Sequence, residues 1–377
     1  MSTIFWSGPL LAGLLTWLIL QLLQPVAARL NLLDHPAGRK DHAHPTPITG
    51  GIAMALAVMV AGMATLTQAG TPFYGFILAS LLLVVVGLLD DRYDLRWWIR
   101  VPAQVVAALV MVYVGDVRVD ELGAAFGITG GSLGWLSVPF TVFATVGLIN
   151  AVNMVDGIDG LAGSLVLAAL LMLGCAALYS GNIMIGERAM VLAGAVSGFL
   201  WYNLRMPWRP KATLFMGNAG SAFLGLAIAW IAFRLTQSPS HPVNPVLALW
   251  LLPIPVMDCL VLLVRRMRQR KSPFSADRDH IHHLMLDAGF SPTQVCATLV
   301  VFSGMCGLLA GQAMRMDVPH PLIMAVFLLM CMVWYWTTAR RARSLRFFRF
   351  VHAHGMFGRP LPRWLQPESS SSSSSST

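Results

Sequence analysis

The sequence predicts an all-α polytopic membrane protein with about eleven transmembrane helices. Of its 377 residues, 56% are hydrophobic and only 11% are charged, whereas soluble domains carry about 25% charged residues. The mean hydropathy is +0.67. Apolar runs recur along nearly the whole chain, close to the roughly 20 residues that a spanning helix needs. Their centres lie near Leu14, Ala57, Leu82, Ala107, Ala144, Leu170, Gly194, Ala227, Pro255, Gly304 and Leu328.

Basic residues are distributed unevenly between the two sides of the predicted bundle. Of the 26 lysines and arginines, 22 fall on one side, and the positive-inside rule assigns that side to the cytosol. An odd number of helices then places the N-terminus outside and the C-terminus inside. The net charge of +9 describes this cytosolic face and gives no support for nucleic-acid binding. The remaining basic residues are Arg118, Arg188, Arg234 and Arg315.

The chain divides into three predicted parts. Residues 1–340 form the transmembrane domain, residues 341–366 a basic tail, and residues 367–377 a disordered serine-rich end. The tail mixes arginine with phenylalanine, which is typical of a helix that lies on anionic lipid. The first apolar run lacks a basic lead and a small-residue cleavage site, so we expect it to be retained as a helix.

Nearly all the unusual polar residues occur in five loops on the basic side. The most informative loop is NAVNMVDGIDGLAG, which begins at Asn150. Asp156 and Asp159 are three residues apart, so at the start of a helix they would share one face. Asn153 precedes Asp156 at the same spacing. Carboxylates at the edge of a bilayer are costly without a partner, so we expect a magnesium ion or a nucleotide near them.

A second loop, LLDDRYDLRWWIR, combines acids with bases. Asp90, Asp91 and Asp94 lie within five residues, and Arg100 follows them. Three carboxylates so close together repel one another unless cations lie nearby. The loop is therefore either a solvated turn neutralised by its own arginines or a site for a metal or a phosphate-bearing substrate.

In one further loop, three prolines and a pair of glycines suggest a shaped segment, and in another, Gly217 and Gly220 would allow a ligand to approach the backbone closely. DHPAGRKDHAHPTPITGG contains Lys40 and His42, which could hold phosphate through charge-assisted hydrogen bonds. A basic juxtamembrane loop is the plainer interpretation. NLRMPWRPKATLFMGNAGS contains Phe215, whose ring could stack on a base, and Asn218, a neutral oxygen ligand. Taken alone, an ordinary helix start also explains that motif.

The fifth loop, RRMRQRKSPFSADRDHIHHLMLDAGFS, is rich in cations and histidines. Its candidate residues are Arg265, Arg278, His280, His282 and His283. Clustered histidines would suit zinc, but no cysteine is near, and adjacent histidines on a helix cannot all face one metal. Hydrogen-bond donation to a phosphate group by histidine and arginine therefore fits better. In the preceding apolar run, we expect Asp258 to form a structural pair rather than to act in catalysis.

The five loops together resemble the polyprenyl-phosphate N-acetylhexosamine-1-phosphate transferase family, and in particular its bacterial N-acetylglucosamine branch. The resemblance covers nearly the whole chain, with the motifs in family order. It implies transfer of N-acetylglucosamine-1-phosphate from UDP-N-acetylglucosamine to undecaprenyl phosphate, with release of UMP, at the bacterial cytoplasmic (inner) membrane. It also implies Mg²⁺, with Mn²⁺ as a substitute, membrane lipid as a partner, a role in starting a cell-envelope polysaccharide such as O-antigen, and a homodimer as one option.

The resemblance assigns roles to individual positions. The expected catalytic residues are Asp90, Asp91, Asp156, Asp159, His280, His282 and His283. The expected substrate-binding residues are Lys40, His42, Asp94, Arg100, Asn150, Phe215, Arg265 and Arg278. Asp159 is expected near uracil, with Phe215 stacking on the base. The expected metal positions are Asn153 and Asn218.

Asn218 departs from the family pattern, which has aspartate at this place in FMGNAGS as a principal magnesium ligand. Asparagine has the same shape without the charge. Hard cations favour anionic oxygen, so we expect weaker metal binding and lower activity. The two explanations are a natural variant with altered metal use and a substitution that traps an inactive enzyme, and we favour the second.

Alternatives differ in donor, in protein class and in mechanism. Another UDP-N-acetylhexosamine, such as a fucosamine derivative, would suit the same motifs. A secondary transporter would suit the helix number, but transporters place polar residues near the midplane, whereas the acids here lie at one edge. For the reaction we expect direct displacement rather than a covalent aspartyl intermediate. The second pKa of a phosphate monoester is about 6, so Asp90 is not obligatory as a base.

Overall fold

The computed structural model describes a protein that is almost entirely helical, which confirms the predicted fold class. The described residues are 3–34, 45–65, 70–128, 130–240, 242–270, 272 and 279–354. The long helices are α1 (Thr3–Ala27), α3 (Thr71–Tyr93), α5 (Ser137–Val155), α6 (Leu161–Tyr179), α7 (Ile183–Asn203), α8 (Gly217–Thr236), α12 (Pro292–Arg315) and α13 (His320–Thr338). The shorter helices are α2 (Gly50–Thr65), α4 (Trp97–Tyr113), α9 (Pro245–Leu251), α10 (Pro253–Arg268), α11 (Ile281–Asp287) and α14 (Arg341–His354).

The remaining regular elements are small. Two short 3₁₀ helices, η1 (Gly123–Phe126) and η2 (Gly134–Leu136), precede α5. One antiparallel strand pair joins β1 (Leu33–Asp34) and β2 (Thr46–Pro47).

Among the described residues, 8 helices are long and apolar enough to cross a membrane, and α9 with α10 brings the number to 9 if the bent pair counts as one span. Each of the predicted run centres falls within a helix. However, α2 has 16 residues and α4 has 17, fewer than the roughly 20 that a span needs. The number of spans and their orientation therefore stay predictions.

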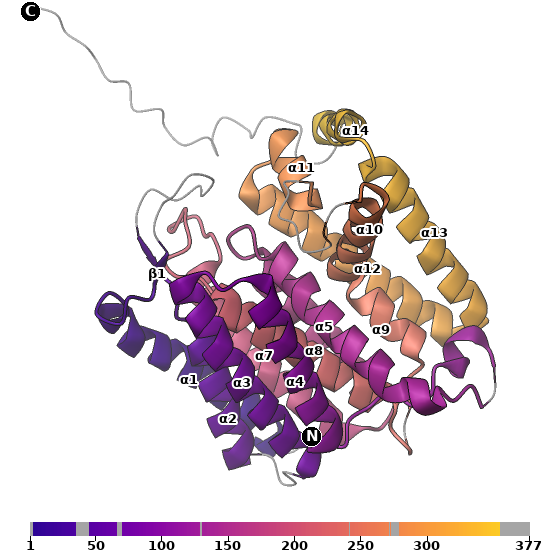
Figure 1. Ribbon diagram of the computed structural model, residues 1–377, viewed down its shortest axis with the longest axis horizontal. Coiled ribbons are helices and arrows are strands. Elements are labelled where there is room, and N and C mark those ends of the chain that lie inside the picture. The colour runs from indigo at the N-terminus through magenta and orange to yellow at the C-terminus, as the bar shows by residue number, and fades with distance from the viewer. Residues whose placement is uncertain are drawn as a thin grey trace, which may run out of the picture.

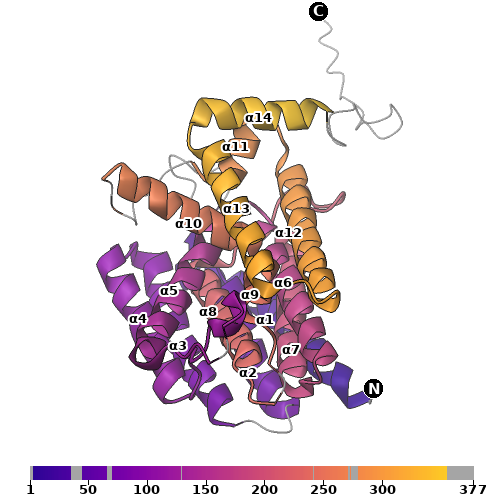
Figure 2. The ribbon, with the colours of Figure 1, turned by 90° about the vertical axis from the view of Figure 1, so that its right-hand side faces the viewer.

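A sharp bend of 90° separates α9 from α10. Pro253 follows Leu252, and a proline disfavours helical backbone in the residue before it. Leu252 accordingly leaves the helical region, with φ −129° and ψ 43°. Figure 2 shows α10 running across the bundle while α9 runs along it. The bend lets a single apolar segment lie partly across one end of the molecule.

Helix α8 is the centre of the bundle, and small residues allow its neighbours to approach it. A Cβ atom on Gly87 of α3 would lie 2.4 Å from the Cα of Ala219. A Cβ atom on Gly51 of α2 would lie 2.3 Å from the backbone nitrogen of Gly220. Glycine is therefore required at both contacts. These contacts bring α2 and α3 directly against the N-terminal turn of α8.

The loops that carry the sequence motifs gather at one end of the bundle, which we call the loop end; it lies at the top of Figure 1. A parallel bridge joins Ile48 to Phe215, and the Phe215 amide donates to the Pro47 carbonyl at 2.8 Å. At the opposite end, Gln237 Oε1 accepts from the Asp120 amide at 3.0 Å. The loop that follows α4 therefore lies at the end of the bundle opposite the motif loops.

Candidate functional site

A cavity of about 350 Å³ lies at the loop end, among α3, α4, α5, α8, α10 and the segment leading into α11. Residues from four of the five motif loops line it. The predicted site residues in its wall are Asp90, Arg100, Asn150, Asn153, Asp156, Asn218, His280, His282 and His283. The spatial convergence expected from the sequence is therefore present for these residues.

Asp90 presents a buried carboxylate oxygen at this cavity. It occupies the last turn of α3 and is 3% exposed. Its Oδ2 lies 3.1 Å from Nη1 of Arg100, in the first turn of α4. Its buried Oδ1 has no hydrogen-bond partner among the described residues. A buried anionic oxygen without a donor is costly, so this atom is suited to a cation or a donor group supplied by a ligand.

Asp91 lies behind the cavity and holds the start of α8. Its Oδ1 accepts from the Asn218 amide at 2.8 Å and its Oδ2 from the Ala219 amide at 3.3 Å. A carboxylate at a helix N-terminus satisfies amides that lack an intrahelical acceptor. Gly217, with φ +70°, makes the turn, and a Cβ atom there would lie 2.5 Å from Asp91 Oδ2. Asp91 therefore positions Asn218 beside Asp90.

Three polar side chains connect α5 and α8 across the cavity. Asn153 Nδ2 donates to Asn218 Oδ1 and to Ser221 Oγ, each at 2.9 Å. Amide orientation is assigned from such networks. With both Nδ2 hydrogens used in this way, the side-chain Oδ1 of Asn153 is the atom left for a ligand.

The oxygens at the cavity suit a hard divalent cation. Mg²⁺ prefers carboxylate, amide and water oxygens, and Asp90, Asp156, Asn153 and Asn218 all line the same wall. Asp90 and Asp156 are the two carboxylates among them, and the Oδ1 of Asp90 has no hydrogen-bond partner among the described residues. No cluster of three or more histidine, cysteine, aspartate or glutamate side chains suited to a metal occurs in the described part of the chain. The donor set thus fits Mg²⁺ with two neutral amides in it.

The expectation that Asp156 and Asp159 share a helix face is wrong. Helix α5 ends at Val155 and α6 begins at Leu161, so both acids lie in the turn between them. Gly160, with φ +78°, takes a left-handed backbone that closes the turn before α6. Asp156 faces the cavity, and burial, with Asp91 and Asp159 nearby, raises its pKa to about 7.

Asp159 points away from the cavity into a second set of contacts. Its Oδ2 lies 2.8 Å from Arg205 Nε and accepts from the Ala212 amide at 3.0 Å. Asp159 thereby ties the turn to the loop between α7 and α8.

Asn150 is held by a residue that the sequence analysis did not select. Its Nδ2 donates to Gln104 Oε1 at 2.7 Å and to the Val146 carbonyl at 2.8 Å. Both Asn150 and Gln104 line the cavity. Because Asn150 Nδ2 is fully used, Asn150 Oδ1 and Gln104 Nε2 are the amide atoms available to a ligand.

His280 forms the structural pair expected for Asp258. The Asp258 Oδ2 atom lies 2.9 Å from His280 Nδ1, and Asp258 Oδ1 accepts from the Ile281 amide at 3.3 Å. Both side chains are buried. The prediction of a pair is confirmed, and it fixes the ring that faces the cavity.

His282 and His283 continue this histidine cluster on α11. Ring centroids of His282 and His283 are 4.3 Å apart, and those of His280 and His282 are 5.6 Å apart. His282 is 1% exposed. Burial, followed by the proximity of His283 and His280, lowers its pKa well below the usual range. His282 is therefore a neutral side chain at physiological pH.

Several predicted residues do not line this cavity. Asp94 ends α3 in a left-handed backbone conformation and is exposed. Phe215 is held through its backbone by Pro47. Arg265 lies 2.8 Å from Asp279 and donates to the Thr338 carbonyl. Lys40, His42 and Arg278 fall outside the described residues.

Besides apolar residues and glycines, the lining residues that were missed include the polar side chains of Gln104, Ser221 and Arg266. Ser221 lies three residues after Asn218, and that spacing places both on one face of a helix. Gln104 is a polar residue in an otherwise apolar helix, four residues after Arg100. Those two signals could have identified them. Arg266 adjoins Arg265, and only the packing of α10 shows which of the two reaches the cavity.

A second, apolar cavity of about 670 Å³ adjoins the first. It lies among α5, α8, α9 and α10, with side chains such as Phe143, Leu252 and Leu260 in its wall. Asn150, Met154 and Arg266 line both cavities. A polar chamber and an apolar chamber thus meet at a shared wall.

Comparison with known proteins identifies one family. Residues 73–236 match glycosyl transferase family 4. Undecaprenyl-phosphate alpha-N-acetylglucosaminyl 1-phosphate transferase of Haemophilus influenzae is 35% identical over 290 residues, covering 77% of this chain and 81% of that protein. The Yersinia pestis protein of that name is 35% identical over 326 residues, covering 86% and 88%. The Escherichia coli K12 protein is 33% identical over 342 residues, covering 90% and 92%.

Proposed function

The chain belongs to glycosyl transferase family 4, and on that premise we propose that it transfers N-acetylglucosamine-1-phosphate from UDP-N-acetylglucosamine to undecaprenyl phosphate. The observation that carries this proposal is the meeting of the polar and apolar cavities at Asn150, Met154 and Arg266. The acceptor has the same two parts, since a charged phosphate is joined to a long apolar chain.

The polar cavity takes the two phosphate-bearing partners in this proposal. An oxygen of the lipid phosphate attacks the phosphorus attached to the sugar, and the bond from that phosphorus to UMP breaks as UMP leaves. Both partners are anionic, so alignment and charge neutralisation dominate the barrier. Arg100 and Arg266 provide positive charge in the cavity wall.

His280 and Asp90 contact the phosphates in this arrangement. With Nδ1 held by Asp258, the Nε2 of His280 is the nitrogen left to reach a phosphate oxygen. Asp90 orients the attacking phosphate or takes its last proton. Because the second pKa of a phosphate monoester is about 6, most of the acceptor is already ionised at neutral pH.

Mg²⁺, with Mn²⁺ as a substitute, is part of this proposal. Asp90, Asn153, Asp156 and Asn218 would hold it. When bound, it would shield the diphosphate charge and stabilise the departing UMP. The neutral side chain of Asn218 is then the weak point of the site.

The apolar cavity takes the first prenyl units of the acceptor. Its wall between α5 and α10 is almost entirely aliphatic and aromatic. Because lipid tails are as apolar as this wall, close packing rather than transfer from water would hold the prenyl units there. The cellular setting that follows is a multi-pass protein of the bacterial inner membrane that starts a cell-envelope polysaccharide. A homodimer stays a prediction.

Release of UMP by the purified protein tests the proposal. We expect UMP only when UDP-N-acetylglucosamine and undecaprenyl phosphate are both present. Asp90→Asn should lower kcat by about a hundredfold, whereas Asp116→Asn, at an exposed position on the opposite end, should leave it unchanged. A faster reaction with another UDP-sugar would change the donor, and no UMP with any donor from either this chain or its Asn218→Asp form would refute the transferase.

The same assay separates the two chemical routes. Direct displacement gives no UMP without the lipid acceptor. A burst of UMP before the acceptor is added would instead require a covalent intermediate on an aspartate.

A further inference from the structure

The exposed side of α13 carries a continuous apolar stripe. Its members recur at helical spacing and are all exposed: Leu322, Val326, Leu329, Val333 and Trp336. A stripe of this kind on a helix long enough to cross a membrane is the face that contacts lipid. Its last member, Trp336, lies at the loop end.

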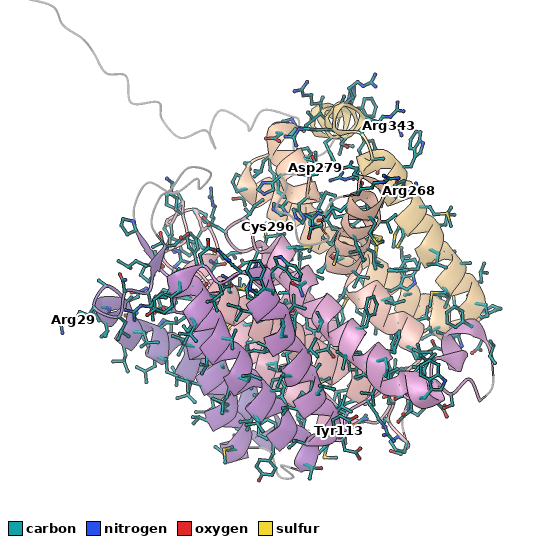
Figure 3. All side chains as sticks on the ribbon, in the orientation of Figure 1. Arg29, Tyr113, Arg268, Asp279, Cys296 and Arg343 are labelled. Carbon is teal, nitrogen blue, oxygen red and sulfur yellow. The ribbon has the colours of Figure 1, made fainter. Side chains whose placement is uncertain are left out.

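Two arginine–aromatic pairs mark where this stripe leaves the lipid core. The Arg343 guanidinium lies 4.1 Å from the ring centroid of Trp336, and its Nη1 donates to the Trp336 carbonyl at 2.9 Å. Arg268 Nη1 donates to the Tyr335 hydroxyl at 2.9 Å. Figure 3 shows Arg268 and Arg343 together at this end of α13. Tryptophan, tyrosine and arginine gather at the headgroup level of a membrane, so that level lies at residues 335–336.

Helix α14 begins five residues later and continues this surface. Ser344 and Phe348 are buried on one side of it. The other side exposes Arg346, Arg349 and two phenylalanines, with Phe347 47% and Phe350 63% exposed. Exposed phenylalanine between arginines is typical of a helix in the headgroup region of an anionic membrane.

The opposite side of α14 holds the histidine-bearing segment. Arg341 Nη1 lies 3.2 Å from Asp279 Oδ1, and Arg341 Nη2 pairs with Asp287 at the end of α11. Asp279 also pairs with Arg265 of α10 at 2.8 Å. The rings of Phe290 and His352 lie 4.7 Å apart. These contacts bracket α11 at both of its ends.

We propose that the exposed face of α14, formed by Arg346, Phe347, Arg349 and Phe350, binds anionic phospholipid headgroups of the membrane that holds the chain, and that this binding fixes α11. The charge of the arginines and the continuity with the α13 stripe identify this occupant. Helix α14 then contacts lipid on one face and α11 on the other, so lipid binding on the first face would hold α11 in place through the second. The proposal concerns the order of α11 and does not rest on the proposed function.

Hydrogen exchange of the full chain tests the proposal. The protein is placed in nanodiscs of phosphatidylcholine with increasing phosphatidylglycerol, and amide exchange is followed in residues 341–354 and 281–287. We expect phosphatidylglycerol to slow exchange in both segments. Each arginine near an anionic surface contributes about a fivefold factor in affinity. In Arg346→Gln/Arg349→Gln, added phosphatidylglycerol should therefore no longer slow amide exchange in either segment. The exposed Arg29→Gln is the matched control and should keep it.

Arg341→Gln separates the two parts of the link. It should leave the lipid response of α14 intact and abolish that of α11. Equal exchange of α14 with and without phosphatidylglycerol, or a full response in Arg346→Gln/Arg349→Gln, would overturn the lipid site. An α11 segment that never responds in the unsubstituted chain would overturn the link. Both exchange responses without UMP release, even from the Asn218→Asp form, would refute the transferase and not this proposal.

Discussion

Asp258 of α10 holds His280, 22 residues further along the chain, through a 2.9 Å contact between the carboxylate Oδ2 and the ring Nδ1. The second carboxylate oxygen accepts from the Ile281 amide at 3.3 Å. One buried carboxylate therefore fixes both the histidine ring and the first residue of α11. His280 lines the cavity, so its Nε2 is presented there by a residue that does not itself line the wall.

Asp258→Asn should lower kcat for UMP release by about ten- to a hundredfold, the range typical for loss of a group that orients a functional histidine. The donor KM should change little, because Asp258 does not line the cavity. The asparagine side chain has the shape of the Asp258 carboxylate, but it lacks the negative charge that holds the His280 ring. Steady-state kinetics on the purified protein measure both constants.

A double substitution distinguishes positioning from general destabilisation. If Asp258 acts through His280, Asp258→Asn/His280→Gln should be no slower than His280→Gln alone. Losses of kcat that simply multiply would contradict this role. Thermal unfolding of each variant checks that the fold persists.

Gly157→Ala should disturb His282 by direct overlap. A Cβ atom at Gly157 would lie 2.5 Å from His282 Nε2, and the ring is buried, so it has little room to move. Overpacking of this kind costs about 1–3 kcal/mol of unfolding free energy. We expect a lower melting temperature together with a lower kcat.

Gly304→Ala is the matched control for Gly157→Ala. A Cβ atom at Gly304, within α12, would meet nothing within 4 Å. The exchange should be neutral or stabilising, since alanine favours a helix by about 1 kcal/mol over glycine. Equal melting temperatures and rates for the two variants would show that His282 tolerates displacement.

Asn218→Asp should raise magnesium-dependent turnover. The side chain lies in the cavity wall with Asp90 and Asp156 and accepts from Asn153, and an aspartate could keep that hydrogen bond. A further negative charge beside two acids should lower the melting temperature without Mg²⁺ and enlarge the rise on adding it. Equal turnover of both forms across a magnesium titration would refute the prediction.

The sequence predicted the convergence of the site because each motif adjoins the end of an apolar run. Asp90, Asn153 and Asn218 each lie within a turn of a helix terminus at the loop end. Once the runs are read as spans, charge asymmetry places these ends on the same side of the membrane, and the five motifs on that side suggested a common site. The length and polarity of the runs are therefore sufficient for this much of the site.

The local geometry of the site required the structure. The acid pair was placed on a helix, although Gly157 and Gly160, on either side of Ile158 and Asp159, are a turn signal in the sequence itself. Arg265 was predicted to bind substrate, but its neighbour Arg266 lines the cavity. Which of the two faces the cavity depends on how α10 packs against helices that are distant in the sequence, and the local sequence does not determine that packing. Gln104 was missed because its partner, Asn150, is 46 residues away.

The acid turn also predicts how stability depends on pH. The pKa of Asp156 is raised from 3.8 to about 7 by burial and by the nearby Asp91 and Asp159. The native chain therefore keeps a proton that the unfolded chain releases. Stability that is present below about pH 4 is then lost as the pH rises through about 7. The loss is at most about 4 kcal/mol and is reduced by solvent screening, since the side chain is only half-buried.

Asp156→Asn should remove this dependence, because an amide does not titrate. Without added metal, we expect the melting temperature of the unsubstituted chain to fall between about pH 4 and about pH 7, and that of Asp156→Asn to fall less. Asp116→Asn, which removes an exposed carboxylate at the opposite end, should keep the original slope. If the melting temperature falls with pH equally in Asp156→Asn and in the unsubstituted chain, the native pKa of Asp156 is not raised and the prediction is wrong. Because a cation at the cavity favours the carboxylate, added Mg²⁺ should flatten the original curve toward that of Asp156→Asn.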